Sequence, residues 1–124
     1  MVNCEELNVI EEIFKKNEGR NFSEVNIPVT SNLDAYKNSD NSEERIRLDL
    51  TLKVGTENDI VLPFYYKIKI SGLFDWVDEK NSGTMRELQD EGSQILYSFV
   101  RTYFFDALKK ANLNPYVLPQ MDII

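Results

Sequence analysis

Two neighbouring stretches in the middle of the chain alternate between apolar and polar side chains. In the first, 45–54, the apolar positions are Ile46, Leu48, Leu50, Leu52 and Val54. In the second, 60–71, they are Phe64, Tyr66, Ile68 and Ile70. A period of two residues places such side chains on one face of a strand. With a turn at Gly55–Asp59 between them, the two stretches predict a long antiparallel hairpin with one buried and one wet face.

The flanking segments have less regular patterns. The N-terminal segment carries apolar residues at helical spacing, namely Leu7, Ile10, Ile13 and Phe14. A strand through the same residues is an open alternative. Val25–Val29 alternates around Pro28, which predicts a short edge strand. Asn38–Glu44 is polar and predicts a mobile loop, and Gly72 predicts a bulge or bend after the hairpin.

The C-terminal third of the chain predicts a helix. Thr84–Glu87 fits a capping box, which opens a first helical turn. Gly92 is expected to interrupt that turn and Ser93 to cap the main helix, Gln94–Ala111. Pro115 prevents continuation. Strands followed by a helix favour an α+β fold, in which the helix lies on one face of an antiparallel sheet.

The main helix is apolar around an unusually wide arc. On a wheel of 100° steps, its apolar residues cover roughly 220°, whereas a helix on one sheet needs a stripe of about 100°. These residues are Ile95, Leu96, Phe99, Val100, Tyr103, Phe104, Ala107, Leu108 and Ala111. The apolar tail Tyr116–Ile124 could cover the surplus. We favour a second subunit, because a nine-residue tail shields only part of the helix.

Composition restricts the function. The chain has 124 residues, which suits one domain spanning 1–124, and a net charge of -7. An acidic field argues against nucleic-acid binding and against attraction to anionic membranes. Cys4 is the only cysteine, so no internal disulfide is possible. The sequence shows neither a signal peptide nor an apolar run of membrane-spanning length, so we expect a cytoplasmic protein without membrane insertion.

The sequence offers little for catalysis. It contains no histidine, which removes His-based triads and His-containing metal sites. It also lacks a glycine-rich phosphate loop, so no cofactor and no metal are expected. The carboxylates that lie close together are Asp75, Asp78, Glu79, Glu87, Asp90 and Glu91. A solvated loop and a helix start explain them better than an acid–base pair, so we expect a protein that is not an enzyme.

Apolar side chains near the end of the hairpin are a stronger indication of function. Leu73, Phe74 and Trp76 follow Gly72, and Tyr65 lies on the nominally wet face of the same hairpin. Each of them could simply complete the core or a subunit contact. Together they suggest the lining of an apolar groove.

The order of these features resembles the SecB and SecB-like family. A long hairpin and the Gly72–Phe74 bend are followed by Ile95–Arg101, which is similar to the family's apolar helix start, with Ser98 in place of the usual proline. The segment Pro115–Ile123 is similar to the family's proline- and leucine-rich extended segment. The resemblance covers about Val25 to Ile124.

The resemblance implies a four-stranded antiparallel sheet with one long helix packed on one face, assembled as a dimer or tetramer. It implies a chaperone that holds unfolded or partly folded polypeptides in apolar grooves without ATP, in protein export or in a SecB-like role such as guarding an antitoxin. Candidate client-binding residues are then Leu33, Tyr65, Leu73, Phe74, Trp76 and Val117. Candidate residues of the oligomer interface are Leu96, Val100, Phe104 and Leu108.

The resemblance favours an export factor and a SecB-like relative equally, but docking on the translocation motor is not expected. The chain stops at Ile124, without the second helix and acidic tail with which export SecB docks on the translocation motor. Two other classes of function stay open. One is a small-molecule carrier with a pocket between sheet and helix, and the other is a self-assembling structural subunit.

Overall fold

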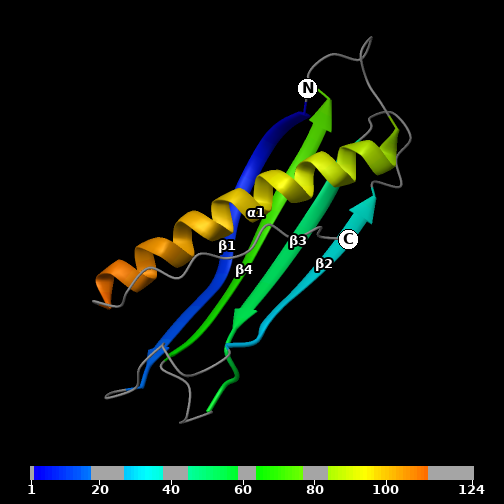
Figure 1. Ribbon diagram of the computed structural model, residues 1–124. Coiled ribbons are helices and arrows are strands. Elements are labelled where there is room, and N and C mark those ends of the chain that lie inside the picture. Colours follow the sequence, from blue (N-terminus) through cyan, green and yellow to red (C-terminus); the bar gives the residue numbers. More distant parts are fainter. Residues whose placement is uncertain (1, 18–26, 38–44, 59–63, 77–83, 112–124) are drawn as a thin grey trace.

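The protein is an antiparallel sheet with one long helix across it. The computed structural model describes residues 2–17, 27–37, 45–58, 64–76 and 84–111. In these ranges it forms strands β1 (Val2–Lys16), β2 (Val29–Lys37), β3 (Arg45–Val54) and β4 (Phe64–Trp76) and helix α1 (Met85–Lys110). The strands form a single sheet in the order β1-β4-β3-β2, and α1 runs diagonally across one face (Figure 1). This confirms the predicted α+β fold class.

Strands β3 and β4 form the predicted hairpin. They pair without irregularity from Arg45 opposite Asp75 to Val54 opposite Tyr66. Every apolar position of the predicted alternation is fully buried on the face under α1. The opposite, outer face is less wet than predicted, since Asp49 and Tyr65 are only 8% and 5% exposed. The predicted segment 60–63 and the loop Asn38–Glu44 lie outside the described residues.

The N-terminal segment is a strand and not a helix. β1 pairs with β4 along its whole length, with register shifts between Cys4 and Glu6 and between Val9 and Glu11. Each shift is a bulge that adds one residue to β1. The bulges reverse the phase of the alternation, so Cys4, Leu7 and Val9 lie opposite Phe74, Gly72 and Ile70 of the buried face. This broken alternation produced the helical spacing in the sequence.

The second edge strand starts later than predicted. The sequence placed it at Val25–Val29, whereas β2 begins at Val29 and ends at Lys37. Pro28 precedes the strand, where its missing N–H costs nothing, and its carbonyl accepts a hydrogen bond of 2.8 Å from the Gly55 amide. Val25 lies outside the described residues. β2 is therefore a nine-residue edge strand.

Helix α1 is continuous, and it starts at the predicted capping box. The Thr84 hydroxyl accepts a hydrogen bond of 3.1 Å from the Glu87 amide, and the Glu87 carboxylate accepts from the Thr84 amide at 3.4 Å. The predicted interruption at Gly92 is wrong. A Cβ atom there would lie 2.8 Å from Leu48 Cδ1, so glycine lets the helix approach β3 closely. Ser93 is not a cap, because its hydroxyl donates to the Asp90 carbonyl inside the helix at 2.9 Å.

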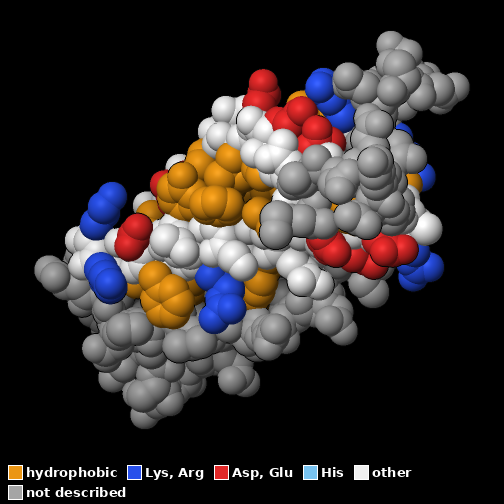
Figure 2. Space-filling view, turned by 90° about the horizontal axis from the view of Figure 1, so that it is seen from above, with side chains coloured by type: hydrophobic (Ala, Val, Ile, Leu, Met, Phe, Trp, Pro, Cys, Tyr) orange, Lys and Arg blue, Asp and Glu red, His pale blue; other side chains and the backbone are white. Residues whose placement is uncertain are grey.

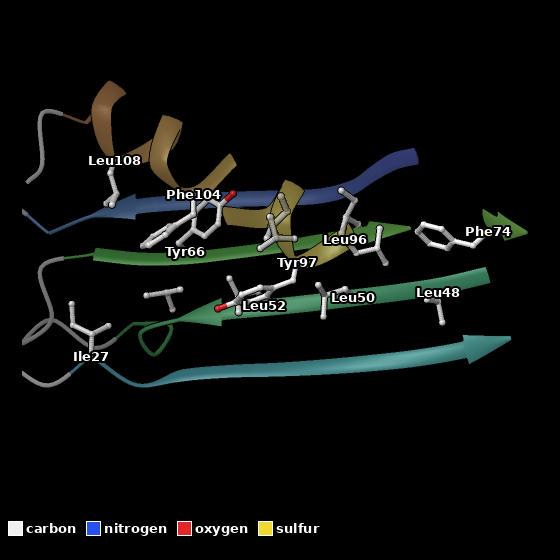
Figure 3. Close-up of a cluster of buried hydrophobic side chains, with 14 of the residues drawn as sticks. Ile27, Leu48, Leu50, Leu52, Tyr66, Phe74, Leu96, Tyr97, Phe104 and Leu108 are labelled. Atoms are coloured by element: carbon white, nitrogen blue, oxygen red, sulfur yellow. The ribbon is translucent and has the colours of Figure 1, made fainter. Parts of the chain in front are cut away.

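One row of side chains on α1 seals the core. The row repeats every four residues and consists of Leu88, Gly92, Leu96, Val100, Phe104 and Leu108, all buried. An i, i+4 row winds around the helix, so it faces the sheet throughout only if the helix crosses obliquely, as it does (Figure 1). The Phe104 ring centroid lies 5.8 Å from that of Phe64 and 5.1 Å from that of Tyr66. Figure 3 shows Phe104 and Tyr66 side by side between α1 and β4.

Gly72 is a packing site and not a bend. β4 continues past it to Trp76, and its pairing with β3 is regular there. A Cβ atom at Gly72 would lie 2.6 Å from Phe74 Cε2 and 3.0 Å from Leu96 Cδ2. The glycine therefore leaves room for a phenylalanine ring beneath the helix.

Replacing this glycine should destabilise the protein. We expect Gly72→Ala to lower the free energy of unfolding by about 1–3 kcal/mol, because the added methyl group forces the Phe74 ring and Leu96 to shift. Urea unfolding followed by circular dichroism measures the change. Gly55→Ala is not a suitable control, since Gly55 has a φ of 92° and would be strained for a different reason. A Gly72→Ala protein as stable as the wild type would show that the core accommodates the methyl group.

Candidate functional site

The predicted client-binding residues do not form one groove. Strand alternation continues through Gly72, so Tyr65 and Leu73 lie on the outer face, whereas Phe74 and Trp76 lie on the face under α1. Phe74 is fully buried and Tyr65 nearly so, which makes both of them unavailable to a partner. The half-buried Leu33 is far from both, on edge strand β2. Val117 lies outside the described residues.

The four residues predicted for an oligomer interface are buried within their own chain. Leu96, Val100, Phe104 and Leu108 all belong to the buried row of α1, and none has exposed surface. These four side chains pack on the sheet of their own chain, so they are core residues. The prediction identified an apolar helix correctly but chose the face that the helix turns inward.

The surplus apolar surface of α1 lies on the flank next to β1. The row beside the buried one contains Ile95 and Tyr103, both partly buried, and Phe99, which is 41% exposed. On β1, Val9 is 39% exposed and Ile10, at the second bulge, is 57% exposed. We call these five residues the β1–α1 strip. Figure 2 shows hydrophobic side chains gathered in the middle of the molecule in the view from above, with charged side chains toward its two ends.

A tyrosine–carboxylate pair joins β4 to β1 beside the strip. The buried phenol of Tyr66 donates a hydrogen bond of 2.6 Å to Glu12 on β1. Burial raises the pKa of Tyr66 far above its usual value, and the Glu12 hydrogen bond and the nearby Tyr103 raise it further. At the end of the same strand, the Lys16 ammonium donates to the Ala111 carbonyl at 3.0 Å, which satisfies an orphan acceptor at the helix C-terminus. β1 and α1 therefore present the strip as one fixed surface.

This strip is suited to binding and not to chemistry. Exposed aliphatic and aromatic side chains gain free energy when a partner removes them from water. The strip also adjoins a sheet edge, because β1 is the outermost of the described strands and pairs on one side with β4. An extended polypeptide could therefore bury apolar side chains on the strip and pair its backbone with β1.

Three of the six carboxylates that lie close together in the sequence are on α1, and Asp75 is at the end of β4 with a buried oxygen that has no hydrogen-bond partner among the described residues. Glu87 belongs to the capping box, and Asp90 and Glu91 are exposed on the helix surface. Asp78 and Glu79 lie outside the described residues. In the part of the chain that the structure describes, no group of three or more His, Cys, Asp or Glu side chains could hold a metal ion. Nor does any helix in that part have the length and apolar character needed to span a membrane.

Comparisons with known proteins show a similarity of fold and none of sequence. The sequence matches no protein-family model and no curated protein. The fold is similar to that of the Mycobacterium tuberculosis SecB-like chaperone Rv1957, whose structure was solved in complex with a ChAD peptide from the Rv1956 HigA1 antitoxin. The superposition has a TM-score of 0.66 and covers 97% of this chain and 87% of that chain, at 13% sequence identity.

Proposed function

Starting from the SecB-like fold of this chain, we propose that it is a chaperone that holds unfolded or partly folded polypeptides without ATP. The observation that carries the proposal is the β1–α1 strip. It exposes aliphatic and aromatic side chains beside a strand edge, and no nucleotide-binding motif accompanies it in the sequence. The neighbouring chaperone, which binds a peptide from an antitoxin, supports a polypeptide as the partner. We place this activity in the cytoplasm.

The mechanism needs only weak and reversible contacts. Apolar side chains of a client lose contact with water on Val9, Ile10 and Phe99, and this burial is worth about 25 cal/mol for each Å². The outer edge of β1, which pairs with no other described strand, accepts the client as an added strand whatever the client's sequence. Because main-chain pairing is sequence-independent and apolar contacts are non-directional, one surface serves many clients.

We also propose that the protein is a homo-oligomer, in which the strip of one copy adjoins that of another. Charge on α1 favours an antiparallel pair of helices. The N-terminal half carries Glu87, Asp90 and Glu91, and the last turn carries Lys109 and Lys110. Two antiparallel copies bring opposite charges together at both ends and place Phe99, close to the middle of the helix, near the two-fold axis.

The decisive experiment is an aggregation assay with a chemically denatured client in the absence of ATP. The wild-type protein should suppress light scattering at several-fold excess. Phe99→Asp should need about tenfold more protein for the same suppression, because losing a central apolar anchor costs roughly 1–2 kcal/mol of binding. Tyr36→Asp is the matched control, since Tyr36 is 48% exposed but lies on the opposite edge strand.

Two results would reject the proposal. One is no suppression by the wild-type protein, and the other is equal loss in both aspartate variants, which would reflect added charge alone. Multi-angle light scattering on the same samples separates the two roles of the strip. A Phe99→Asp protein that is monomeric and inactive implies that the client binds an assembled surface, whereas an inactive oligomer implies direct contact with Phe99.

The carrier hypothesis receives less support. Tyr66, Phe74, Leu96 and Phe104 are fully buried and fill the layer between sheet and helix in which a ligand would have to lie (Figure 3).

A further inference from the structure

The outer face of the sheet carries a lysine cluster that the holding activity does not use. Its members are Lys53 on β3 and Lys67 and Lys69 on β4. All three alternate with residues of the buried face, so they point away from α1 and from the β1–α1 strip. In a chain with a net charge of -7, three lysines on two adjacent strands are a local reversal of charge.

The register brings like charges into direct opposition. Lys53 is the cross-strand partner of Lys67, and Lys69 follows two residues along the same strand. Directly opposed side chains have Cβ atoms about 4.5–5.5 Å apart, and like charges at that distance destabilise a sheet. Lys53 and Lys69 have no ion-pair partner in the described ranges, so this repulsion is only partly relieved within the chain. A loss of stability that the chain does not compensate is typical of binding surfaces, where function is retained at the expense of stability.

One carboxylate of the chain already shows what the cluster binds. Glu11 on β1 lies 2.6 Å from the Lys67 ammonium. The pKa of Glu11 is lowered mainly by the hydrogen bond and charge of Lys67, and additionally by the charges of Lys69 and Lys53. The charges of all three lysines thus favour the Glu11 carboxylate, which forms an ion pair with Lys67 and is the cross-strand partner of Lys69.

We propose that Lys53, Lys67 and Lys69 form a second binding site, on the outer face, for an acidic segment of a polypeptide in extended conformation. An extended chain projects every second side chain to the same side, about 6.7 Å apart, which is also the spacing of Lys67 and Lys69 along β4. A Glu-x-Glu segment aligned with the strand therefore matches the two lysines, and Lys53 completes the site. The protein's overall negative charge disfavours nucleic acid, whose charge density is higher and continuous.

Fluorescence anisotropy with a labelled Glu-Ser repeat peptide of about ten residues tests the site, at about 50 mM salt, where screening is modest. The double variant Lys53→Gln/Lys69→Gln should lose about fivefold in affinity, since it removes two exposed charge contacts. It leaves the ion pair between Lys67 and Glu11 in place. Lys109→Gln/Lys110→Gln makes the same charge change at exposed positions of the last helical turn and should lose less than about twofold.

A further variant tests the role of Glu11. Glu11→Gln should bind the peptide more tightly than the wild type, because the competing carboxylate is gone. The proposal is overturned if the wild type does not bind the peptide, if both double variants lose equally, or if a Lys-Ser peptide binds as well. It is also overturned if an oligothymidylate of equal charge displaces the peptide with equal or higher affinity, because the site would then select negative charge of any kind.

The result is separable from the holding activity. The aggregation assay applied to Lys53→Gln/Lys69→Gln should give wild-type suppression, since the β1–α1 strip is intact. Peptide binding without aggregation suppression by the wild type would reject the holding function and leave the acidic-segment site standing. Suppression of aggregation without peptide binding would reject the acidic-segment site and leave the holding function standing.

Discussion

Phe74→Asp is expected to leave the protein unfolded. The Phe74 ring is fully buried, lies close to Gly92 of the helix and is the cross-strand neighbour of Ile46 and Cys4. Removing it forfeits about 3–5 kcal/mol of packing. Placing an unpaired carboxylate there costs several kcal/mol more. Together these losses match the whole stability of a typical domain, about 5–15 kcal/mol.

Far-UV circular dichroism and size-exclusion chromatography measure this outcome directly. Phe99→Asp is the matched control, because it introduces the same charge on the same face of the sheet but at a side chain that is 41% exposed. It should keep the wild-type spectrum and, at protein concentrations at which the wild type is monomeric, the wild-type urea midpoint. A folded Phe74→Asp protein with a normal midpoint would mean that Phe74 turns outward in solution, as the sequence pattern suggested.

Phe104→Ala should reduce the free energy of unfolding by about 3–5 kcal/mol without changing the fold. The ring of Phe104 contacts those of Phe64 and Tyr66, and the contact joins α1 to β4. The remaining helix side chains on the row cannot fill the space, because their positions are fixed one turn away at Val100 and Leu108. The measurement is urea unfolding monitored by circular dichroism.

Phe99→Ala provides the comparison for this loss. The same truncation on the neighbouring helix row should lower the free energy of unfolding of a monomer by less than about 1 kcal/mol, since the Phe99 side chain is partly solvated. Equal losses at the two positions would indicate that Phe99 is buried in an assembly, and the loss at Phe99 would then depend on protein concentration.

The sequence predicted the central hairpin because burial there is one-sided. Under that condition a slip of one residue would expose every apolar side chain, so β3 and β4 carry a strict alternation that is easy to read. The capping box at Thr84 was equally clear, because its two reciprocal hydrogen bonds need particular residue types at fixed spacing. Both features depend on local sequence alone.

Strand β1 was ambiguous because bulges interrupt its alternation. The inserted residues lie at about Glu5 and Ile10, and they move the inward positions from Cys4 to Leu7 and from Val9 to Glu12. Spacings of three residues result, as in a helix. Only the pairing with β4, whose residues lie far from their β1 partners in sequence, as Val2 does from Trp76, resolves the ambiguity, and a local pattern contains no information on that partner.

The sequence predicted the candidate site at the wrong residues for a related reason, namely that a local pattern does not show which side of an element faces the core. An apolar arc of about 220° shows that a helix has more than one apolar contact, but not which part of the arc faces its own sheet. The oblique crossing of α1 decides this, and it places Leu96 and Phe104 inward and Phe99 outward. Similarly, glycine at position 72 suggested a bend that would release Phe74, whereas its actual role is to accommodate that ring.

The strand order has a consequence for biosynthesis. β1 is synthesised before the other described strands, yet its partner among them is β4, which is synthesised last, and β3 lies between β4 and β2. With translation at about 5–20 residues per second, the N-terminal strand waits several seconds for its neighbour. During that interval Leu7, Val9 and Phe14 have no sheet to join, so this segment of the nascent protein itself requires protection from aggregation.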